Sequence, residues 1–268
     1  MPARDPGRDA TSALQRQPFA GPLRPRAQRS AAAMRGEATR TDAPGDQALA
    51  HGLSGQGVDW LVHAGLAPYA ETVRAMEARA VAIADGAARE AIWLVEHPAL
   101  YTAGTSARRA DLIDPDRLPV FETGRGGQYT YHGPGQLIAY PLFDLEHFFT
   151  DIHKYMRYLE EVVIQTVGEF GIAAGRIKGL TGVWVDPDNS VKARKICAFG
   201  VRASRWVTMH GLALNVNTDL TYFGHIVPCG IQDKAVTSLQ HELGAPVNME
   251  SVREILKDKF VSIFEVSL

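Results

Sequence analysis

The sequence predicts an α+β protein. Segments with helical periodicity alternate with groups of short apolar runs, so the expected strands fall in clusters with helices between the clusters. Within the largest cluster the links between runs are short, polar and rich in turn-forming residues, which is typical of antiparallel hairpins. This arrangement argues against a parallel sheet built from repeated strand-helix-strand units.

The first predicted helix covers Tyr69–Ala84. Apolar residues recur along it at helical spacing, and Gly86 follows as a stop signal. Two apolar runs, 91–95 and 137–142, are too short for helices and predict buried strands. These segments supply one helix and two strands before the hairpins begin.

A second, longer helix is predicted from Asp151 to Phe170. Asp151 is a suitable N-cap, and Gly171 lies just past the end, where helices often stop. Three strand-like runs and a last helix follow. The runs cover Gly182–Asp186, Lys195–Arg202 and Trp206–Val216, and the helix covers about Ser251–Phe264.

Composition is that of an ordinary globular protein. Of the 268 residues, 46% are apolar and 22% charged, and the net charge is −2. No apolar run reaches the roughly 18 to 20 residues that cross a bilayer, and the start lacks the apolar core of a secretory signal, so we expect a cytoplasmic protein without membrane contacts. The nearly neutral charge argues against nucleic-acid binding. Because no His, Cys, Asp or Glu cluster has metal-ligand spacing, we expect no metal.

Residues 1–48 differ in composition from the rest. They contain eight arginines, no lysine and five acidic residues, a net charge of +3, with little to bury. We therefore expect a disordered extension. Two other interpretations stay open: a targeting peptide, which the acidic residues disfavour, and translation that starts at Met34. Residues 49–268, with a net charge of −5, are expected to form a single domain.

The densest unusual segment is 124–136, with the sequence GRGGQYTYHGPGQ. Its glycines permit backbone conformations with positive φ and the close approach of a ligand. The segment lacks both the helix that follows a dinucleotide-binding loop and the Gly-Lys-Ser/Thr ending of a phosphate-binding loop. Its composition fits a ligand-binding loop and a tightly turning surface loop equally well.

The chain has two cysteines, too few for a disulfide framework. Cys197 lies in an alternating strand pattern, and we expect it to be structural. Cys229 lies between Pro228 and Gly230, which would present its thiol in a loop that an acyl group can approach. A lone cysteine is nevertheless more often a small buried residue than a nucleophile.

A nucleophilic thiol needs a nearby cation or base. Lys195, at the start of a predicted strand, could favour the thiolate and move protons, although the residues alone slightly favour a solvated hairpin charge. His132 and His210, each beside a glycine, are further candidates. A structural histidine is the commoner outcome for either of them.

Together these motifs resemble those of the lipoyl(octanoyl) transferases. The resemblance covers the chain from about residue 52 to the C-terminus and leaves out the extension. The motifs, in order, are Arg125-Gly126-Gly127 with Thr130, the run 132–136, the run 182–185, Lys195-Ile196 with Gly200, His210-Gly211 with Leu214-Asn215, and Pro228-Cys229-Gly230-Ile231.

The resemblance implies a fold shared with biotin and lipoate protein ligases, a mostly antiparallel mixed sheet packed against helices. It implies transfer of an octanoyl group from acyl carrier protein to a lysine ε-amine of a lipoyl domain, without ATP or another cofactor. The implied acceptors are the lipoyl domains of 2-oxoacid dehydrogenase E2 subunits and the glycine cleavage H protein. The reaction is the first step of endogenous protein lipoylation.

The resemblance also assigns residues. Cys229 would be the nucleophile that carries the acyl thioester, and Lys195 the catalytic lysine. Cys197 departs mildly from the pattern, which would place a smaller or inert residue there. The residues assigned to substrate binding are Arg125, Gly126, Gly127, Gln128, Tyr129, Thr130, Tyr131, His132, Ala198, Phe199, Gly200, His210, Gly211, Leu212 and Ala213.

Three rival functions stay open. An ATP-using lipoate or biotin ligase would need no nucleophilic cysteine, a non-catalytic acyl-binding module would need neither Cys229 nor Lys195, and a cysteine hydrolase would admit water to the acyl-enzyme. Because both implied partners are acidic, docking would depend on a local basic patch. Candidate residues for this patch are Arg108, Arg109, Arg125, Arg176, Lys178, Lys192, Arg194 and Arg205.

Overall fold

The computed structural model describes residues 57–227 and 235–268. The chain divides into two units, residues 1–44 and 45–268, and the described residues all belong to the second. The expected extension 1–48 lies outside the described residues. So do Cys229 and its neighbours Pro228, Gly230 and Ile231.

The main element is an eight-stranded mixed sheet with the order β1-β2-β6-β10-β9-β8-β7, in which β11 also pairs with β9. The pairs β1–β2 and β11–β9 are parallel, and the other pairs are antiparallel. The mostly antiparallel mixed sheet and the α+β class are therefore confirmed. The strands are β1 (Asp59–Leu66), β2 (Ala91–Glu96), β6 (Gln136–Leu142), β7 (Ala174–Ile177), β8 (Leu180–Val185), β9 (Arg194–Ser204), β10 (Val207–Asn215) and β11 (Ala235–Val236).

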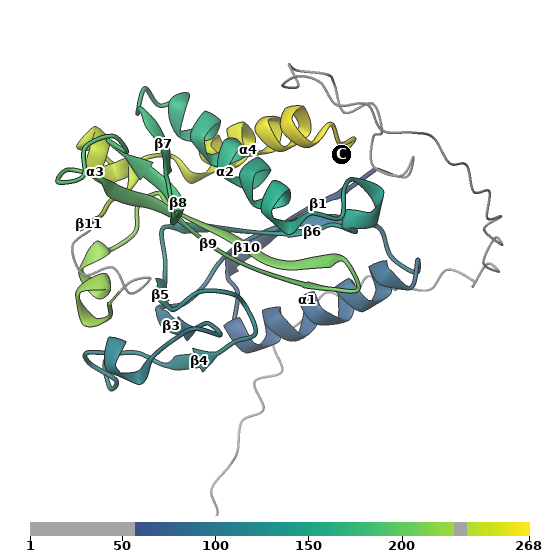
Figure 1. Cartoon of the computed structure of the whole chain (residues 1–268), viewed down its shortest axis with the longest axis horizontal. Helices are drawn as coiled ribbons and strands as arrows, with labels where there is room; N and C mark the ends of the chain where they lie inside the picture. Colours follow the sequence, from purple (N-terminus) through teal and green to yellow (C-terminus); the bar gives the residue numbers. More distant parts are fainter. Residues whose placement is uncertain (1–56, 228–234) are drawn as a thin grey trace, which may run out of the picture. The chain divides into compact units, whose positions relative to one another are not determined.

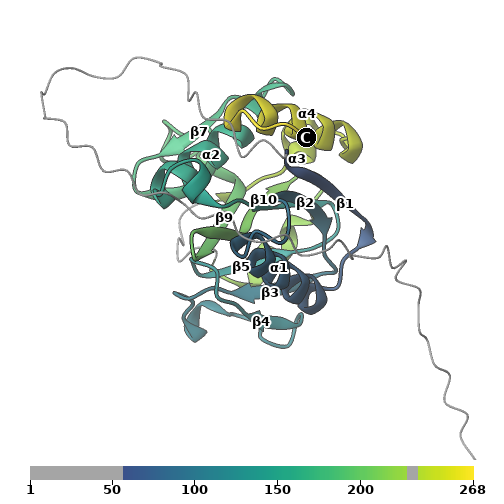
Figure 2. The same cartoon turned by 90° about the vertical axis from the view of Figure 1, so that its right-hand side faces the viewer.

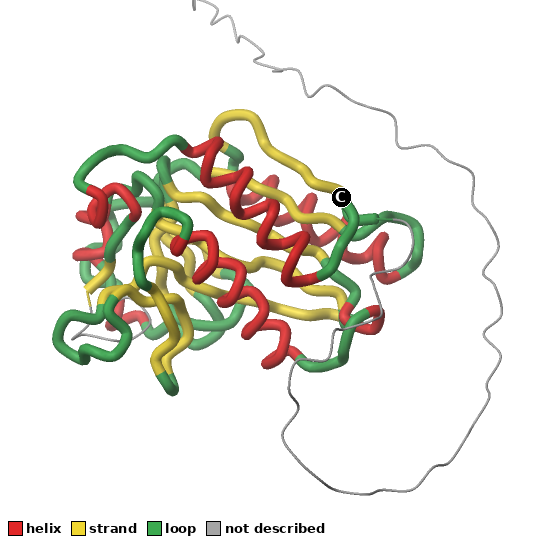
Figure 3. The backbone as a smooth tube through the Cα atoms, turned by 90° about the horizontal axis from the view of Figure 1, so that it is seen from above, coloured by secondary structure: helices red, strands yellow, loops and turns green. Residues whose placement is uncertain are grey.

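Helices cover both faces of this sheet. Helices α2 and α4 lie side by side on one face, and α1 lies on the other (Figures 1 and 3). The predicted N-cap of α2 is confirmed, because the Asp151 side chain accepts hydrogen bonds from the backbone N–H groups of residues 153 and 154. The helices are α1 (Tyr69–Ala84), α2 (Ile152–Gly168), α3 (Leu239–Leu243) and α4 (Met249–Phe264), with short 3₁₀ helices η1 (Arg109–Asp111), η2 (Leu145–His147) and η3 (Leu220–His225).

A second, three-stranded sheet lies on the same side of the large sheet as α1 (Figure 2). Its order is β4-β3-β5, from β3 (Leu100–Ala103), β4 (Val120–Glu122) and β5 (Tyr129–His132). It packs through a small aromatic cluster against η3. The two sheets enclose the candidate site between them.

The largest apolar core lies between the big sheet and helices α2 and α4. Alternate residues of the strands point into it, among them Val183 and Val185 of β8 and Leu212 and Leu214 of β10. Burial of this face accounts for the two amphipathic helices that the sequence predicts. The opposite face of the same strands is left to form the site.

The structure contains one strand-helix-strand unit that the hairpin pattern does not predict. Strand β1 pairs in parallel with β2, and α1 connects them. β1 is an edge strand with a half-exposed sequence that lacks regular alternation, so periodicity does not identify it. The glycine-rich segment also contains a regular strand, β5, whose four residues are all buried.

Candidate active site

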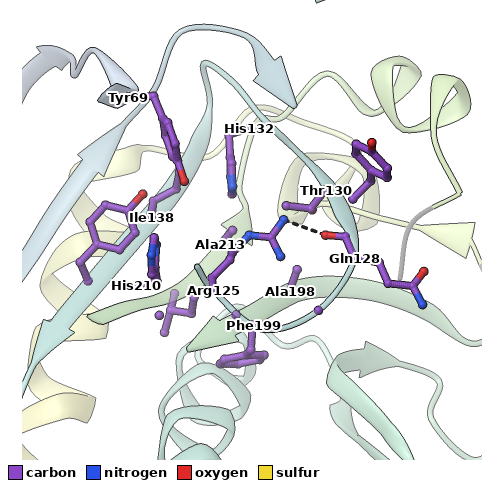
Figure 4. Close-up of a pocket in the computed structure, with 16 residues that line it drawn as sticks. Tyr69, Arg125, Gln128, Thr130, His132, Ile138, Ala198, Phe199, His210 and Ala213 are labelled. Atoms are coloured by element: carbon purple, nitrogen blue, oxygen red, sulfur yellow. Dashed lines mark hydrogen bonds between the residues drawn. The ribbon is translucent and has the colours of Figure 1, made fainter. Parts of the chain in front are cut away.

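A pocket lies where β5 of the small sheet faces β6, β9 and β10 of the large sheet, with the first residue of α1 at one end (Figure 4). It encloses about 490 Å³ of space, part of it open to solvent, and its surface is mostly apolar. The lining residues are Tyr69, Arg125, Gly127, Gln128, Tyr129, Thr130, His132, Ile138, Tyr140, Ala198, Phe199, Gly200, His210, Gly211, Leu212 and Ala213.

Small residues on the two central strands leave this space open. Ala198 of β9 is paired with Ala213 of β10, and Gly200 with Gly211. A Cβ atom on Gly211 would come within 2.3 Å of the Ala139 carbonyl oxygen, and one on Gly200 within 2.8 Å of Arg125 Cδ. Larger residues at these positions would therefore either fill the pocket or displace its walls.

Arg125 holds the glycine-rich segment in place from inside the protein. The residue is buried, and its guanidinium donates to the Thr102 hydroxyl and carbonyl and to the carbonyls of Gly126 and Gln128. The bond to Gln128 is visible in Figure 4. The cation thus stabilises the pocket wall through backbone acceptors, a use that needs the fixed fork of donors of an arginine.

Three buried histidines lie at or behind one end of the pocket. Burial lowers the pKa of His132 to about 3 and the pKa values of His97 and His210 to about 4. His132 Nδ1 lies 2.8 Å from Gln136 Oε1, and His97 Nε2 lies 2.8 Å from the Tyr140 hydroxyl. These rings are neutral near pH 7, so the end of the pocket carries polar groups without net charge.

His210 has an unusual backbone conformation, with φ of 59° within strand β10. A non-glycine residue in the left-handed region is strained, and such strain is often kept where it directs a side chain. Here the imidazole lies on the pocket wall beside Tyr140, with ring centroids 6.1 Å apart. The sequence prediction of His210 as a pocket residue agrees with this geometry.

A chain of buried hydrogen bonds runs from His132 to the strand that carries Lys195. Gln136 Nε2 donates to Asn215 Oδ1 at 2.9 Å, and Asn215 Nδ2 donates to the Thr237 carbonyl at 2.9 Å. The Thr237 N–H in turn donates to the Lys195 carbonyl at 2.9 Å. The network joins β5, β6, β10 and β9 across the floor of the site.

A β-bulge in β9 turns Lys195 toward the site. Val183 pairs with Cys197, but Trp184 pairs with Lys195, so Ile196 is an extra residue in β9. Ile196 and Cys197 both face the large core, and Lys195 therefore points to the opposite side of the sheet. Its side chain is 6% exposed.

Lys195 lines a second, smaller pocket that adjoins the first. Thr130, Ala198 and Ala213 are common to both pockets, so the lysine pocket opens beside the apolar one. Phe223 of η3 and Val236 of β11 also line it. These two elements flank the segment that contains Cys229 in the sequence, while Cys229 itself lies outside the described residues.

The structure places Cys197 away from the site. Its thiol is fully buried in the large core, and burial raises its pKa well above the ordinary value. The structural role that the strand pattern predicts for Cys197 agrees with this position.

All the residues predicted to bind substrate line the pocket except Gly126 and Tyr131. Tyr131 packs instead in the aromatic cluster with Tyr101 and Phe223, because its neighbours Thr130 and His132 face the pocket and strand residues alternate. Sequence reasoning did not assign Tyr69, Ile138 and Tyr140 to the site. Each was predicted as part of a helix or strand, and only the packing of α1 and β6 shows that they reach the pocket.

Within residues 57–227 and 235–268, no group of three or more His, Cys, Asp and Glu side chains could hold a metal ion. No helix of these described ranges is long and apolar enough to cross a membrane.

Comparison with known proteins agrees with this geometry. The family described as lipoyl protein ligase A/B catalytic domain matches residues 68–261. An octanoyltransferase of Cytophaga hutchinsonii is 56% identical over 179 residues, 65% of this chain and 73% of the relative. One from Cereibacter sphaeroides is 50% identical over 214 residues, 77% of this chain and 98% of the relative. The chain belongs to the octanoyltransferase family.

Octanoyltransferases are acyltransferases, and an enzyme of this class needs an apolar pocket beside its reacting groups. The fold is shared more widely. A lipoate-protein ligase A solved with bound ATP superimposes with a TM-score of 0.59 at 17% identity, covering 80% of this chain and 87% of that one. At this identity the likeness shows the fold alone, and it confirms the expected lipoate-ligase architecture.

Proposed function

We propose that this chain transfers an octanoyl group from acyl carrier protein to a lysine ε-amine of a lipoyl domain, through a thioester on Cys229. The observation that supports the proposal is that the Lys195 pocket adjoins an apolar pocket, with Thr130, Ala198 and Ala213 lining both. An acyl chain in the larger pocket would place its carbonyl carbon near the lysine. The finer assignments to residues and partners follow from the family.

The first step is transthioesterification. The Cys229 thiolate attacks the thioester carbonyl of the donor, and the bond to the carrier sulfur breaks. The carrier leaves as a thiol after it takes a proton from Lys195, which is thereby left neutral for the second step. One thioester replaces another, so no ATP is needed. A positively charged Lys195 would favour the Cys229 thiolate in this step.

In the second step the acceptor amine attacks the acyl-enzyme. A C–N bond forms, the C–S bond to Cys229 breaks, and the amine loses a proton to a base. Neutral Lys195 is the candidate base. The amide is more stable than the thioester, which makes this step favourable.

The described flanks of residues 228–234 support the role of Cys229. On one side the Val227 N–H donates to the Asp111 carbonyl at 2.7 Å. On the other side Val236 pairs with Lys195. The second flank therefore lies at the lysine pocket itself, which Val236 also lines, and this supports a nucleophile that works beside Lys195.

The same contacts suggest where the carrier protein docks. Arg108 and Arg109 are exposed, form no ion pair with a described residue, and lie next to Asp111, whose carbonyl accepts a hydrogen bond from the Val227 N–H. Four of the six other predicted patch residues are already engaged: Arg125 is buried, Arg176 is paired with Glu160 and Glu161, Arg194 with Asp186 and Glu242, and Arg205 with Asp85. Lys178 and Lys192 are exposed but have no comparable contact with the described segment before residue 228. We assign the docking patch to Arg108 and Arg109.

An ATP-using ligase on the same fold is the main alternative, and one assay separates the two. Purified protein is incubated with an apo lipoyl domain and either octanoyl carrier protein without ATP or free octanoate with ATP and Mg²⁺. We expect the domain to gain an octanoyl group only from the carrier. Modification only from free octanoate with ATP would make the chain a ligase.

We expect the reaction in the cytoplasm, and this stays a prediction.

A further inference from the structure

Trp184 is a fully buried residue on the site face of the sheet that the reaction as proposed does not use. It is 1% exposed, and its neighbours Val183 and Val185 point into the core on the opposite face. The indole Nε1–H is buried without a hydrogen bond to any residue in the described part of the chain. A buried N–H group without a hydrogen-bond partner is rare in proteins and calls for a physical explanation.

The Lys195 ammonium lies over the Trp184 ring. Trp184 and Lys195 are directly paired across β8 and β9, so their side chains emerge on the same face. Lys195 Nζ lies 4.7 Å from the ring centroid of Trp184. This distance is well inside the range of about 6 Å over which an aromatic ring attracts a cation.

The space that holds the Lys195 side chain is bounded by Gly182 as well as by the Trp184 ring. Its φ is +137°, a conformation that side chains disfavour, and a Cβ atom there would come within 2.9 Å of Lys195 Cε and 3.2 Å of Trp184 Nε1. The lysine side chain therefore runs between the indole ring and a position that must lack a side chain. The bulge at Ile196 is what turns the lysine into this space.

We propose that Trp184 is the positioning residue of Lys195: its electron-rich ring attracts the ammonium and holds it in the lysine pocket, which adjoins the apolar pocket. The inference rests on the proposed function only for its consequence in catalysis. Its physical content, the contact between the Trp184 ring and the Lys195 ammonium, is testable without turnover.

Among the described residues, Lys195 is the one charged side chain that lines the lysine pocket. The pocket is otherwise lined by Thr130, Gln136, Ala198, Ala213, Asn215, Phe223 and Val236. His132 lies behind Gln136 and is neutral, and the Cys197 thiol lies on the other side of the sheet. Arg194, next along β9, is paired with Asp186 and Glu242.

The test reads the protonation of Lys195 directly. The intact protein is acetylated briefly with acetic anhydride over a range of pH, and labelling of Lys195 is followed by peptide mass analysis. Because only the neutral amine reacts, the midpoint of labelling reports proton loss. In Trp184→Leu we expect the midpoint to fall by about one pH unit, whereas Trp184→Phe, which keeps an aromatic face, should shift it by less than half as much. Equal midpoints in Trp184→Leu and the parent protein would overturn the inference.

A second pair of variants covers the case in which Trp184→Leu does not fold. Gly182→Ala displaces Lys195 from the ring, and Gly179→Ala is its control, because Gly179 also has positive φ (+82°) but no atom near the added Cβ. We expect the pH midpoint of Lys195 labelling to fall in Gly182→Ala and to equal the parent value in Gly179→Ala. If both leave it unchanged, the inference is wrong. If Lys195→Ala transfers acyl groups at the parent rate, the lysine assignment in the proposed function fails, while the labelling result still decides the role of Trp184.

Discussion

Gln136 and Asn215 face each other across the central strands β6 and β10, joined by a hydrogen bond of 2.9 Å between Gln136 Nε2 and Asn215 Oδ1. Both side chains are buried, and both line the lysine pocket. Gln136 continues the chain to His132, and Asn215 continues it to the carbonyl of Thr237, whose N–H bonds the Lys195 carbonyl. The pair is therefore the structural link between the acyl pocket and the lysine pocket.

Replacing Asn215 by Leu keeps the approximate size but leaves buried partners unsatisfied. We expect the free energy of unfolding to fall by about 1–3 kcal/mol, measured by urea denaturation. The Gln136→Met/Asn215→Leu double variant should lose less than the sum of the single losses, because the two groups interact. Gln165→Met, on the exposed face of α2, is the control and should change stability by no more than about 0.5 kcal/mol. Strict additivity would show that the pair is not coupled.

Ala213 limits the width of the pocket at its junction with the lysine pocket. In Ala213→Leu the added side chain would occupy space that a long acyl chain needs. We expect the rate of transfer from octanoyl carrier protein to fall at least tenfold, with a smaller loss for a butanoyl donor. Steady-state rates with the two donors measure this. Ala110→Leu, at an exposed position, is the control. An unchanged ratio of the two rates would place the acyl chain elsewhere.

The three buried histidines make stability depend on pH. Their pKa values in the folded protein, about 3 for His132 and about 4 for His97 and His210, lie below the ordinary value of 6.5. The unfolded chain therefore binds more protons than the folded one below pH 6.5, so stability is present above this pH and is lost as the pH falls toward 4. The loss is at most about 1.4 kcal/mol per pH unit for each histidine.

Urea denaturation at pH 7, 6 and 5 measures this dependence. We expect a steady decrease in the free energy of unfolding below pH 6.5 and a shallower decrease in His132→Asn, which removes one of the three groups. His153→Gln, at an exposed position on α2, should keep the parent slope. A flat profile from pH 7 to 5 in the parent protein would contradict neutral buried histidines.

The docking assignment predicts a change in substrate affinity. Arg108→Glu/Arg109→Glu should raise the KM for octanoyl carrier protein about tenfold at low salt and leave kcat within a factor of two. The difference should shrink as salt screens the charges. Lys154→Glu/Lys257→Glu changes the net charge equally on α2 and α4, away from the site, and is the control. An equal rise in KM in both double variants would show that the net charge of the protein, and not this patch, determines its affinity for the carrier.

The fold was predictable where local patterns decide it. The three long helices and the strands that carry apolar or alternating runs appear where periodicity places them, with small shifts at their ends. Trp206, expected to begin a strand, instead lies with Arg205 in a turn of positive φ between β9 and β10. Strands β1, β7 and β11 and the three short strands of the small sheet were not predicted, because they are short or half exposed.

The site was predictable as a set of motifs but not as a geometry. The glycine-rich segment and the small residues around Gly200 and Gly211 are evident in the sequence. Tyr69 and Tyr140 are not, since nothing local marks them as pocket residues. The bulge at Ile196 is also invisible in the sequence, because a regular strand would place Lys195 and Cys197 on the same face. Only the pairing of β9 with β8 shows that Lys195 faces the site.

The central claim is that the octanoyl group passes through Cys229, and the most direct measurement is intact mass analysis of the enzyme after a short incubation with octanoyl carrier protein in the absence of an acceptor. We expect one octanoyl adduct, located by peptide mapping on Cys229, that disappears when an apo lipoyl domain is added and never forms in Cys229→Ser. An adduct on Cys197, or transfer by Cys229→Ser at the parent rate, would contradict the claim.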